Sequence, residues 1–185
     1  MIIIVASVRV KEINGAAPGT FATITTARFA TMDSNNPGIS NPIPIPTTGV
    51  RRAYKKAFAL AFAGTFTQIN NVTIYTDGTD FGTGILTLIG SNVGAGCHVL
   101  GSYRAALGQL GVDGSLLTYA RQAGSVITGT GSFFTYTSGA KKLVGSQIFA
   151  AAGTTRFVAL QLKVGSNAVQ GVLSSETITF TYDEI

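Results

Sequence analysis

Charge is scarce in this sequence. Charged residues make up 11% of the chain, against roughly 25% in ordinary soluble domains. Hydrophobic residues make up 45%, and there are 23 glycines. The surface must therefore be covered largely by hydroxyl groups, glycine and alanine. Low charge harms the solubility of a free monomer but is tolerated by a subunit that buries much of its surface, so the composition favours a protein that works in an assembly.

Cysteine and histidine occur once each, as the adjacent Cys97 and His98. A single cysteine excludes an intrachain disulfide and fits synthesis in a reducing cytoplasm. Neighbours on a strand point to opposite faces, so we do not expect this pair to act as a nucleophile and its base. Two such residues are also too few for a metal site built on soft ligands. We expect a buried thiol and a polar loop histidine.

No other catalytic pattern stands out. The eight acidic residues are scattered, and no spacing selects a pair for acid–base chemistry. The glycine-rich stretches GSNVGAG and SGAKKL lack the lysine or the spacing of a phosphate-binding loop. Asp77 and Asp80 lie in DGTDFGTG, which favours a plain turn, with calcium as the open alternative. We therefore expect no enzyme, no catalytic residue, no cofactor and no metal.

The net charge of +5 is distributed without a continuous basic stripe, so we do not expect nucleic-acid binding. The N-terminal run MIIIVASVRV is too short for a membrane span and has no basic region before it, so we expect no membrane association. Arg51, Arg52, Lys55 and Lys56 form a basic quartet ahead of the most hydrophobic strand. They are either solvated charges at a strand entrance or a docking surface for an acidic partner.

Helix signals are nearly absent, and period-two alternation dominates. The best helical candidate is 102–110, which Gly108 weakens. Strands are predicted at 1–13, 20–31, 50–63, 65–76, 85–90, 132–137, 143–150, 155–164 and 175–185. This succession predicts an all-β protein: one antiparallel β-sandwich domain over 1–185, with a jelly-roll-like arrangement.

Two strands have informative faces. In 50–63 the large residues Phe58, Leu60 and Phe62 share one face, and Ala57, Ala59, Ala61 and Ala63 form the other. Such a strand is buried on its large face and closely approached on its small face, by the second sheet or by a neighbouring subunit. In 155–164 we expect the core face to be Val158, Leu160, Leu162 and Val164.

Residues 34–49 hold four of the five prolines. Proline removes backbone donors and fixes φ, so this segment is extended but cannot be an interior strand. It is either an ordinary surface loop or an arm that lies on a neighbour. Ile39, Ile43 and Ile45 stand between the prolines and would otherwise face water. We therefore expect residues 36–48 to be ordered by contact with another subunit or with the major shell protein.

Two stretches resemble structural proteins of tailed-bacteriophage virions. One is YKKAFALAFAGTFTQINNVTIY, residues 54–75, in which an apolar strand leads through a Gly-Thr-Phe-Thr step to a second strand. The other is FVALQLKVGSNAVQGVLSSETITFTYDEI, residues 157–185, which closes on a threonine-rich strand. The resemblance implies a small β-sandwich virion protein of the capsid decoration, or cement, type. It carries over no functional residue.

The resemblance also implies partners and a place. The protein would be made in the host cytoplasm and would lie on the capsid surface of the virion, bound to the major capsid protein. Self-association as a homotrimer would match threefold positions of an icosahedral shell. The alternative is a receptor- or carbohydrate-binding module at the tail or neck, although such sites favour aromatics and tryptophan is absent. The expected interface residues are Arg51, Arg52, Lys55, Lys56, Ile39, Ile43 and Ile45.

Overall fold

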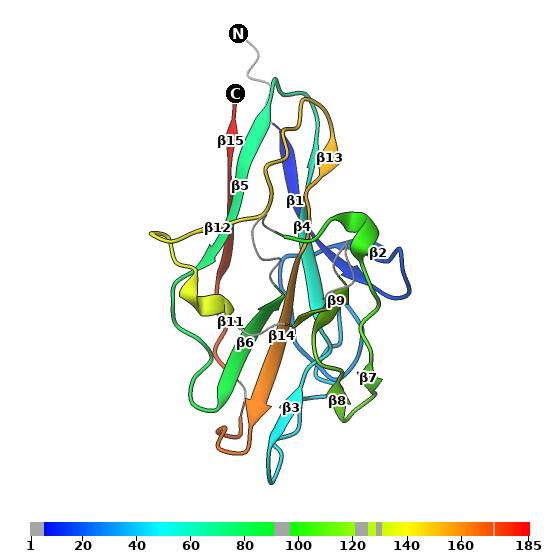
Figure 1. The fold of residues 1–185 in the computed structure, drawn as a ribbon, viewed down its shortest axis with the longest axis vertical. Coiled ribbons are helices and arrows are strands. Elements are labelled where there is room, and N and C mark those ends of the chain that lie inside the picture. The colour runs from blue at the N-terminus through cyan, green and yellow to red at the C-terminus, as the bar shows by residue number, and fades with distance from the viewer. Residues whose placement is uncertain (1–5, 91–96, 121–125, 129–130, 172) are drawn as a thin grey trace.

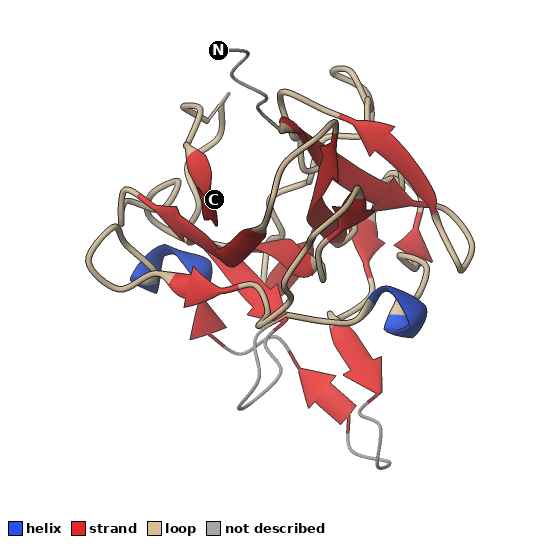
Figure 2. Ribbon diagram, turned by 90° about the horizontal axis from the view of Figure 1, so that it is seen from above, coloured by secondary structure: helices blue, strands red, loops and turns tan. Residues whose placement is uncertain are grey.

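The computed structural model describes residues 6–90, 97–120, 126–128, 131–171 and 173–185. Strands hold 41% of the described chain and helices 4%, which confirms the predicted all-β fold. The helical part consists of two 3₁₀ turns, η1 (Leu100–Ser102) and η2 (Phe133–Thr135). They lie on opposite sides of the strands when the molecule is viewed from above (Figure 2).

The larger sheet has eight strands, with β11-β6-β14-β4-β1-β2 as its main order; β13 also pairs with β4, and β3 with β14. Its long strands run along the long axis of the molecule (Figure 1). The bounds are β1 (Ser7–Asn14), β2 (Thr20–Thr23), β3 (Val50–Arg52), β4 (Lys56–Ala63), β6 (Ile85–Gly90), β11 (Gly131–Ser132), β13 (Gly153–Thr154) and β14 (Val158–Gly165).

The smaller sheet has three strands in the order β12-β5-β15. Their bounds are β12 (Lys142–Leu143), β5 (Ile69–Thr76) and β15 (Ile178–Glu184). Two further ribbons of two strands each pair β7 (Gly108–Gln109) with β8 (Asp113–Gly114), and β9 (Thr118–Ala120) with β10 (Val126–Thr128).

The main core lies between the two sheets. The predicted large face of β4 is confirmed, because Phe58, Leu60 and Phe62 are all buried in it. From the smaller sheet, Val72 and Ile74 of β5 belong to the same cluster. Aromatic rings add directional contacts: the Phe62 ring centroid lies 5.2 Å from that of Phe149 and 5.5 Å from that of Tyr182. The antiparallel β-sandwich is therefore confirmed, while its jelly-roll connectivity stays a prediction.

A bulge in β5 explains why its sequence departs from strict alternation. Ile69 and Val72 are both buried although three positions separate them. Asn71 between them has φ of 50°, and the pairing with β15 shifts between Thr181 and Asp183. An extra residue in one strand turns the following side chains to the opposite face. The bulge thus keeps both halves of β5 facing the core.

The other face of the larger sheet is covered by the chain itself. Ala57 and Ala59 of β4 pack in a second buried cluster with Tyr103 and Leu117. The small face of β4 is therefore approached by the segment that follows residue 97, rather than by the second sheet, while Ala63 at the far end is exposed.

Strand β14 is buried on both faces. Val158, Leu160, Leu162 and Val164 lie in the core as predicted, but Phe157, Ala159 and Gln161 of the opposite face are also 0% exposed. The expectation of a single core face is thus too narrow, because β14 sits between the two clusters.

Several segments differ from their predicted structure, among them 143–150, where the strand β12 ends at Leu143. Within 20–31 only Thr20–Thr23 is a strand, because Ile24, Ala27 and Phe29 then pack on the core at irregular spacing. In place of a helix at 102–110 there is the short η1 followed by β7, with Gly108 paired to Gly114. In 132–137, the Ser132 hydroxyl accepts a bond from the Phe134 N–H and begins η2.

Candidate functional site

The basic quartet does not form one exposed surface. Arg51 lies in β3, and its Nη1 is 3.0 Å from Asp113 Oδ2, with both side chains partly exposed. Arg52 is half-buried. Lys56 begins β4 and is only 2% exposed. Its predicted docking role is therefore corrected: the Lys56 ammonium faces the interior, where Glu12 compensates its charge.

Lys55 is only partly buried, in contrast to Lys56. Burial lowers its pKa to about 8, an effect that Asp33 opposes and Arg104 reinforces. Lys55 and Lys56 are adjacent in sequence, so they leave the strand in opposite directions. The two lysines therefore have different electrostatic neighbours, and only Lys55 retains access to solvent.

The buried pair of Lys56 and Glu12 is the most unusual charge arrangement among the described residues. Lys56 Nζ donates to Glu12 Oε1 at 2.6 Å and to the Ser34 carbonyl at 2.8 Å. The Glu12 side chain is 0% exposed. Asn14 Nδ2 donates to the same Glu12 Oε1 at 3.0 Å and to Asp33 Oδ1 at 2.9 Å. Buried charges require this kind of pairing, because an isolated charge in a protein interior is very costly.

Hydrogen bonding in this cluster is incomplete. Glu12 Oε2 and Asn14 Oδ1 are both buried and have no hydrogen-bond partner. Sequence reasoning did not single out Glu12 or Asn14. The sequence does place an acidic residue in the apolar first strand and a lysine at the start of the most hydrophobic strand. No local pattern in the sequence, however, indicates that these two side chains are in contact.

The Pro-rich segment is held by its own chain. The Thr31 N–H donates to the Asn41 carbonyl at 2.9 Å, and Arg28 Nη1 donates to the Gly38 carbonyl at 2.6 Å. Ile43 packs against a cluster formed by Ala53, Leu162 and Val164. These contacts tie parts of the segment to its own chain, while its ordering by another subunit or by the major shell protein stays a prediction.

Two of the three predicted isoleucines nevertheless face solvent. Ile39 is 90% exposed and Ile45 is 37% exposed. The β7–β8 hairpin is linked to the segment through Thr31, whose carbonyl accepts from the Gly111 N–H at 3.0 Å and whose N–H donates to the Asn41 carbonyl. This hairpin region exposes Leu107 and Leu110 by 67% and 66%. We call Ile39, Leu107 and Leu110 the aliphatic surface.

Cys97 and His98 point into different clusters, as their adjacency predicts. Cys97 is buried in the main core, and burial raises its pKa to about 12. The His98 ring stacks on Phe157 of the second cluster with centroids 5.2 Å apart, and its Nε2 lies 2.9 Å from the Gly90 carbonyl oxygen. A carbonyl only accepts, so Nε2 carries the proton. Burial lowers the pKa of His98 to about 4.

Asp77 and Asp80 act as turn caps. Asp77 Oδ1 accepts from the Thr79 N–H at 2.9 Å. Asp80 accepts from the Phe81 N–H and from both the N–H and the hydroxyl of Thr87. Among the described residues, no group of three or more His, Cys, Asp or Glu side chains is placed to hold a metal ion.

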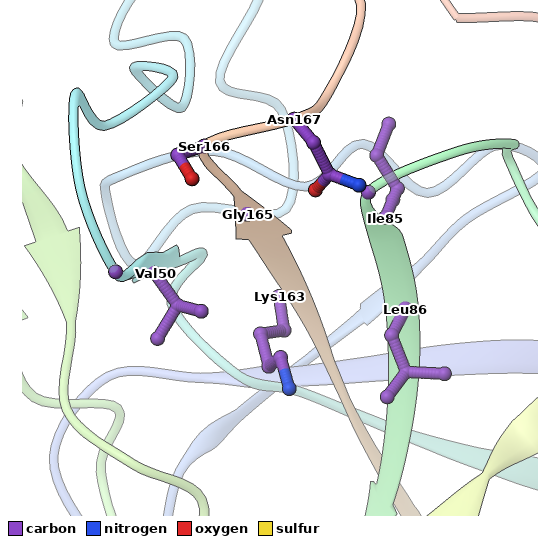
Figure 3. A pocket seen from close by; sticks show the side chains of 9 residues that line it. Val50, Ile85, Leu86, Lys163, Gly165, Ser166 and Asn167 are labelled. Carbon is purple, nitrogen blue, oxygen red and sulfur yellow. The ribbon is translucent and has the colours of Figure 1, made fainter.

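A shallow depression of about 360 Å³ lies where β3 and β6 begin and β14 ends (Figure 3). Val50, Leu86 and Lys163 contribute side chains, and Asn167 comes from the loop after β14. The described residues that line it include no aromatic side chain. It therefore lacks the stacking platform that carbohydrate sites usually use.

No family model matches this chain, and neither curated proteins nor solved structures include a significant match. Within the described part of the chain, no helix is long and apolar enough to cross a membrane.

Proposed function

We propose that this protein is a structural virion component, a capsid decoration protein that binds the major capsid protein of a tailed phage. The observation that carries the proposal is the aliphatic surface: Ile39 is 90% exposed, Leu107 67% and Leu110 66%, on backbone that intrachain hydrogen bonds hold in place. Contiguous exposed apolar side chains are typical of an interaction site, and we propose that these three act together as one. A preorganised segment binds at a lower cost in conformational entropy than a flexible one.

The distribution of charge supports the same role. With 11% charged residues, the chain has little to keep copies of it apart, which favours self-association. Arg51 and Arg52 of β3 are the members of the basic quartet whose side chains are partly exposed, together with Lys55. They would meet acidic groups of the shell, and such rim contacts weaken as salt screens them over about 8–10 Å.

The residue that follows β15 is held by backbone hydrogen bonds, which suits a subunit that is added to a shell in many copies. Gln68 and Ile185 exchange both backbone hydrogen bonds, at 3.1 and 2.9 Å. Residues paired in this way need no further ordering when subunits assemble. We propose a homotrimer as the assembled unit, which sizing with light scattering at high concentration tests directly; a monomer there would overturn the trimer.

The experiment for the virion role is quantitative mass spectrometry of purified particles from the source, with copy number per particle. We expect the protein in many copies on filled heads. Its absence from particles would overturn the proposal, and its confinement to tail or neck fractions would favour the receptor- or carbohydrate-binding alternative.

Matched variants test the surface itself. Ile39→Asp with Leu110→Asp should release the protein from particles while leaving its circular dichroism unchanged. Val169→Asp is the control, because Val169 is 73% exposed but lies in the loop after β14. If the double variant and the control occupied particles equally, the aliphatic surface would not be the surface that binds the capsid.

A further inference from the structure

Three side chains of the buried cluster have the functional groups of an amide-forming reaction. Lys56 supplies an amine, Asn14 supplies a carboxamide, and Glu12 supplies a carboxyl group that contacts both. Lys56 Nζ and Asn14 Nδ2 lie 2.6 and 3.0 Å from the same oxygen, Glu12 Oε1. The amine and the carboxamide are thus separated by no more than the two hydrogen bonds that they make to one atom.

Sheet register produces this arrangement. Strands β1 and β4 are antiparallel, with Ile13 opposite Ala57. The next pair along the ladder is Asn14 and Lys56, whose side chains therefore stand side by side on one face. Glu12 lies two residues before Asn14 on the same strand, so it shares that face. Phe58 faces Glu12 across the ladder and is buried in the main core, which keeps the site apolar on that side.

We propose that Lys56 and Asn14 become joined by an amide bond between Nζ and Cγ, in a reaction that the folded protein carries out on itself with Glu12 as the proton carrier. The inference does not depend on the virion role.

The reaction begins with a proton transfer. The Lys56 ammonium gives a proton to Glu12 across their 2.6 Å contact, which leaves a neutral amine and a neutral acid. The proton moves along an existing hydrogen bond, so the transfer requires no rearrangement of the two side chains. The lone pair of Nζ is then free to attack Asn14 Cγ.

Attack forms the Nζ–Cγ bond and places negative charge on Asn14 Oδ1. Glu12 passes its proton to Asn14 Nδ2, the Cγ–Nδ2 bond breaks and its electron pair leaves with ammonia. The surplus proton on Nζ returns to Glu12. The lysine and asparagine side chains lose the elements of ammonia and keep one hydrogen on the new amide nitrogen, and Glu12 ends protonated. No oxidant, reductant or other reactant is required.

The two unpartnered atoms support this chemistry. Glu12 Oε2 and Asn14 Oδ1 are buried without partners, and an ionised Glu12 can only accept hydrogen bonds. A protonated Glu12 is a donor as well, and its hydroxyl can bond to the oxygen that becomes the amide carbonyl. Protonation thus offers a partner to atoms that are otherwise costly to bury. The same bond stabilises the charge that develops on Oδ1 during attack.

Asp33 positions the leaving nitrogen. Its Oδ1 accepts from Asn14 Nδ2 at 2.9 Å, and its Oδ2 accepts from the Gly15 N–H at 2.8 Å. The second bond matters because Asn14 precedes a glycine. In such a pair the Gly15 nitrogen can attack Cγ instead and form a succinimide, with the same loss of ammonia, and Asp33 holds that nitrogen in a hydrogen bond.

Intact-mass spectrometry of the denatured full-length protein tests the proposal. We expect the main species to be lighter than the sequence mass by one ammonia. Trypsin should then yield a branched peptide that joins 12–28 to the peptide beginning at Lys56. The unmodified sequence mass, after prolonged incubation of the folded protein at pH 8, would overturn the proposal.

Variants separate this bond from its competitors. Lys56→Met should abolish the loss of ammonia, while Lys55→Met, the neighbouring-lysine control, should retain it. Glu12→Gln should slow the loss at least tenfold. A loss that persists in Lys56→Met would identify the succinimide and overturn the proposal, as would a branched peptide linked through Asp33 with loss of water. If Lys56→Met fails to fold, the wild-type branched peptide and its fragmentation still decide the question.

Discussion

The carboxamide of Gln161 connects β14 to the segment that covers it: Oε1 of Gln161 accepts from the Leu117 N–H at 2.8 Å. The Gln161 Nε2 donates to the Ala53 carbonyl at 2.9 Å and to the Ser115 carbonyl at 2.7 Å. The Gln161 carboxamide lies in the protein interior, since the residue is 0% exposed. One polar side chain therefore provides hydrogen-bond partners for three backbone groups that lie outside the paired strands.

Replacing Gln161 by Met keeps the volume but removes these bonds. We expect the free energy of unfolding to fall by about 3–5 kcal/mol, because each buried group left unpaired costs roughly 1–3 kcal/mol. Urea unfolding followed by tyrosine fluorescence measures it. Gln170→Met, at an exposed position, is the control and should change stability little. A Gln161 variant as stable as this control would contradict the structural role of the carboxamide.

The two ion pairs should differ sharply in their contribution to stability. In the protein before the proposed amide bond forms, Lys56→Met leaves Glu12 buried without its partner, so we expect a loss of about 3–5 kcal/mol relative to the unlinked wild type. Arg51→Met breaks a pair whose side chains are 39% and 35% exposed. Such a surface pair contributes about 0–1 kcal/mol. Combining Glu12→Leu with Lys56→Met should restore part of the loss. Denaturant titration of the wild type, the two single variants and the double variant measures the order of their unfolding free energies. Equal effects of Lys56→Met and Arg51→Met would contradict the burial of the first pair.

Protonation of His98 should make the fold less stable in acid. Burial lowers its pKa to about 4 in the folded protein, from 6.5 in the unfolded chain. The unfolded state therefore binds the proton more readily, and the contribution of neutral His98 is fully present above pH 6.5 and is lost as pH falls toward 4. The loss amounts to roughly 3 kcal/mol, at 1.36 kcal/mol per unit of pKa.

His98→Asn is the comparison for this prediction. Between pH 6.5 and 4 its stability should fall less steeply than that of the wild type, since the carboxylates are common to both proteins. Parallel curves of unfolding free energy against pH would show that His98 does not titrate in this way.

Cys97 should be inert in the native protein. Burial raises its pKa to about 12, with Lys142 and Arg156 opposing the shift, and the side chain is 0% exposed. Thiol reagents attack the thiolate, which needs both ionisation and access. We expect labelling by an aromatic disulfide reagent at pH 8 to be at least a hundredfold slower in buffer than in concentrated denaturant. Labelling at the same rate in both would place the thiol at the surface.

The sequence by itself determined the class of fold and the directions of side chains along each strand. Alternation in 50–63 placed Phe58, Leu60 and Phe62 on one face, and adjacency alone separated Cys97 from His98. The prolines excluded an interior strand at 34–49. These conclusions follow from the period of two in extended backbone, which is a local property of the chain.

Only the tertiary structure decided which strands pair and what covers them. The register of β1 on β4 brings Glu12 and Asn14 to Lys56, more than forty residues away in the chain, and converts a lysine predicted to be at the surface into a buried one. The segment around Leu117 covers the small face of β4, where a second sheet or a neighbour was the alternative. Alternation specifies the face of a strand, but it does not specify its partner, because pairing depends on packing and hydrogen bonds between distant segments.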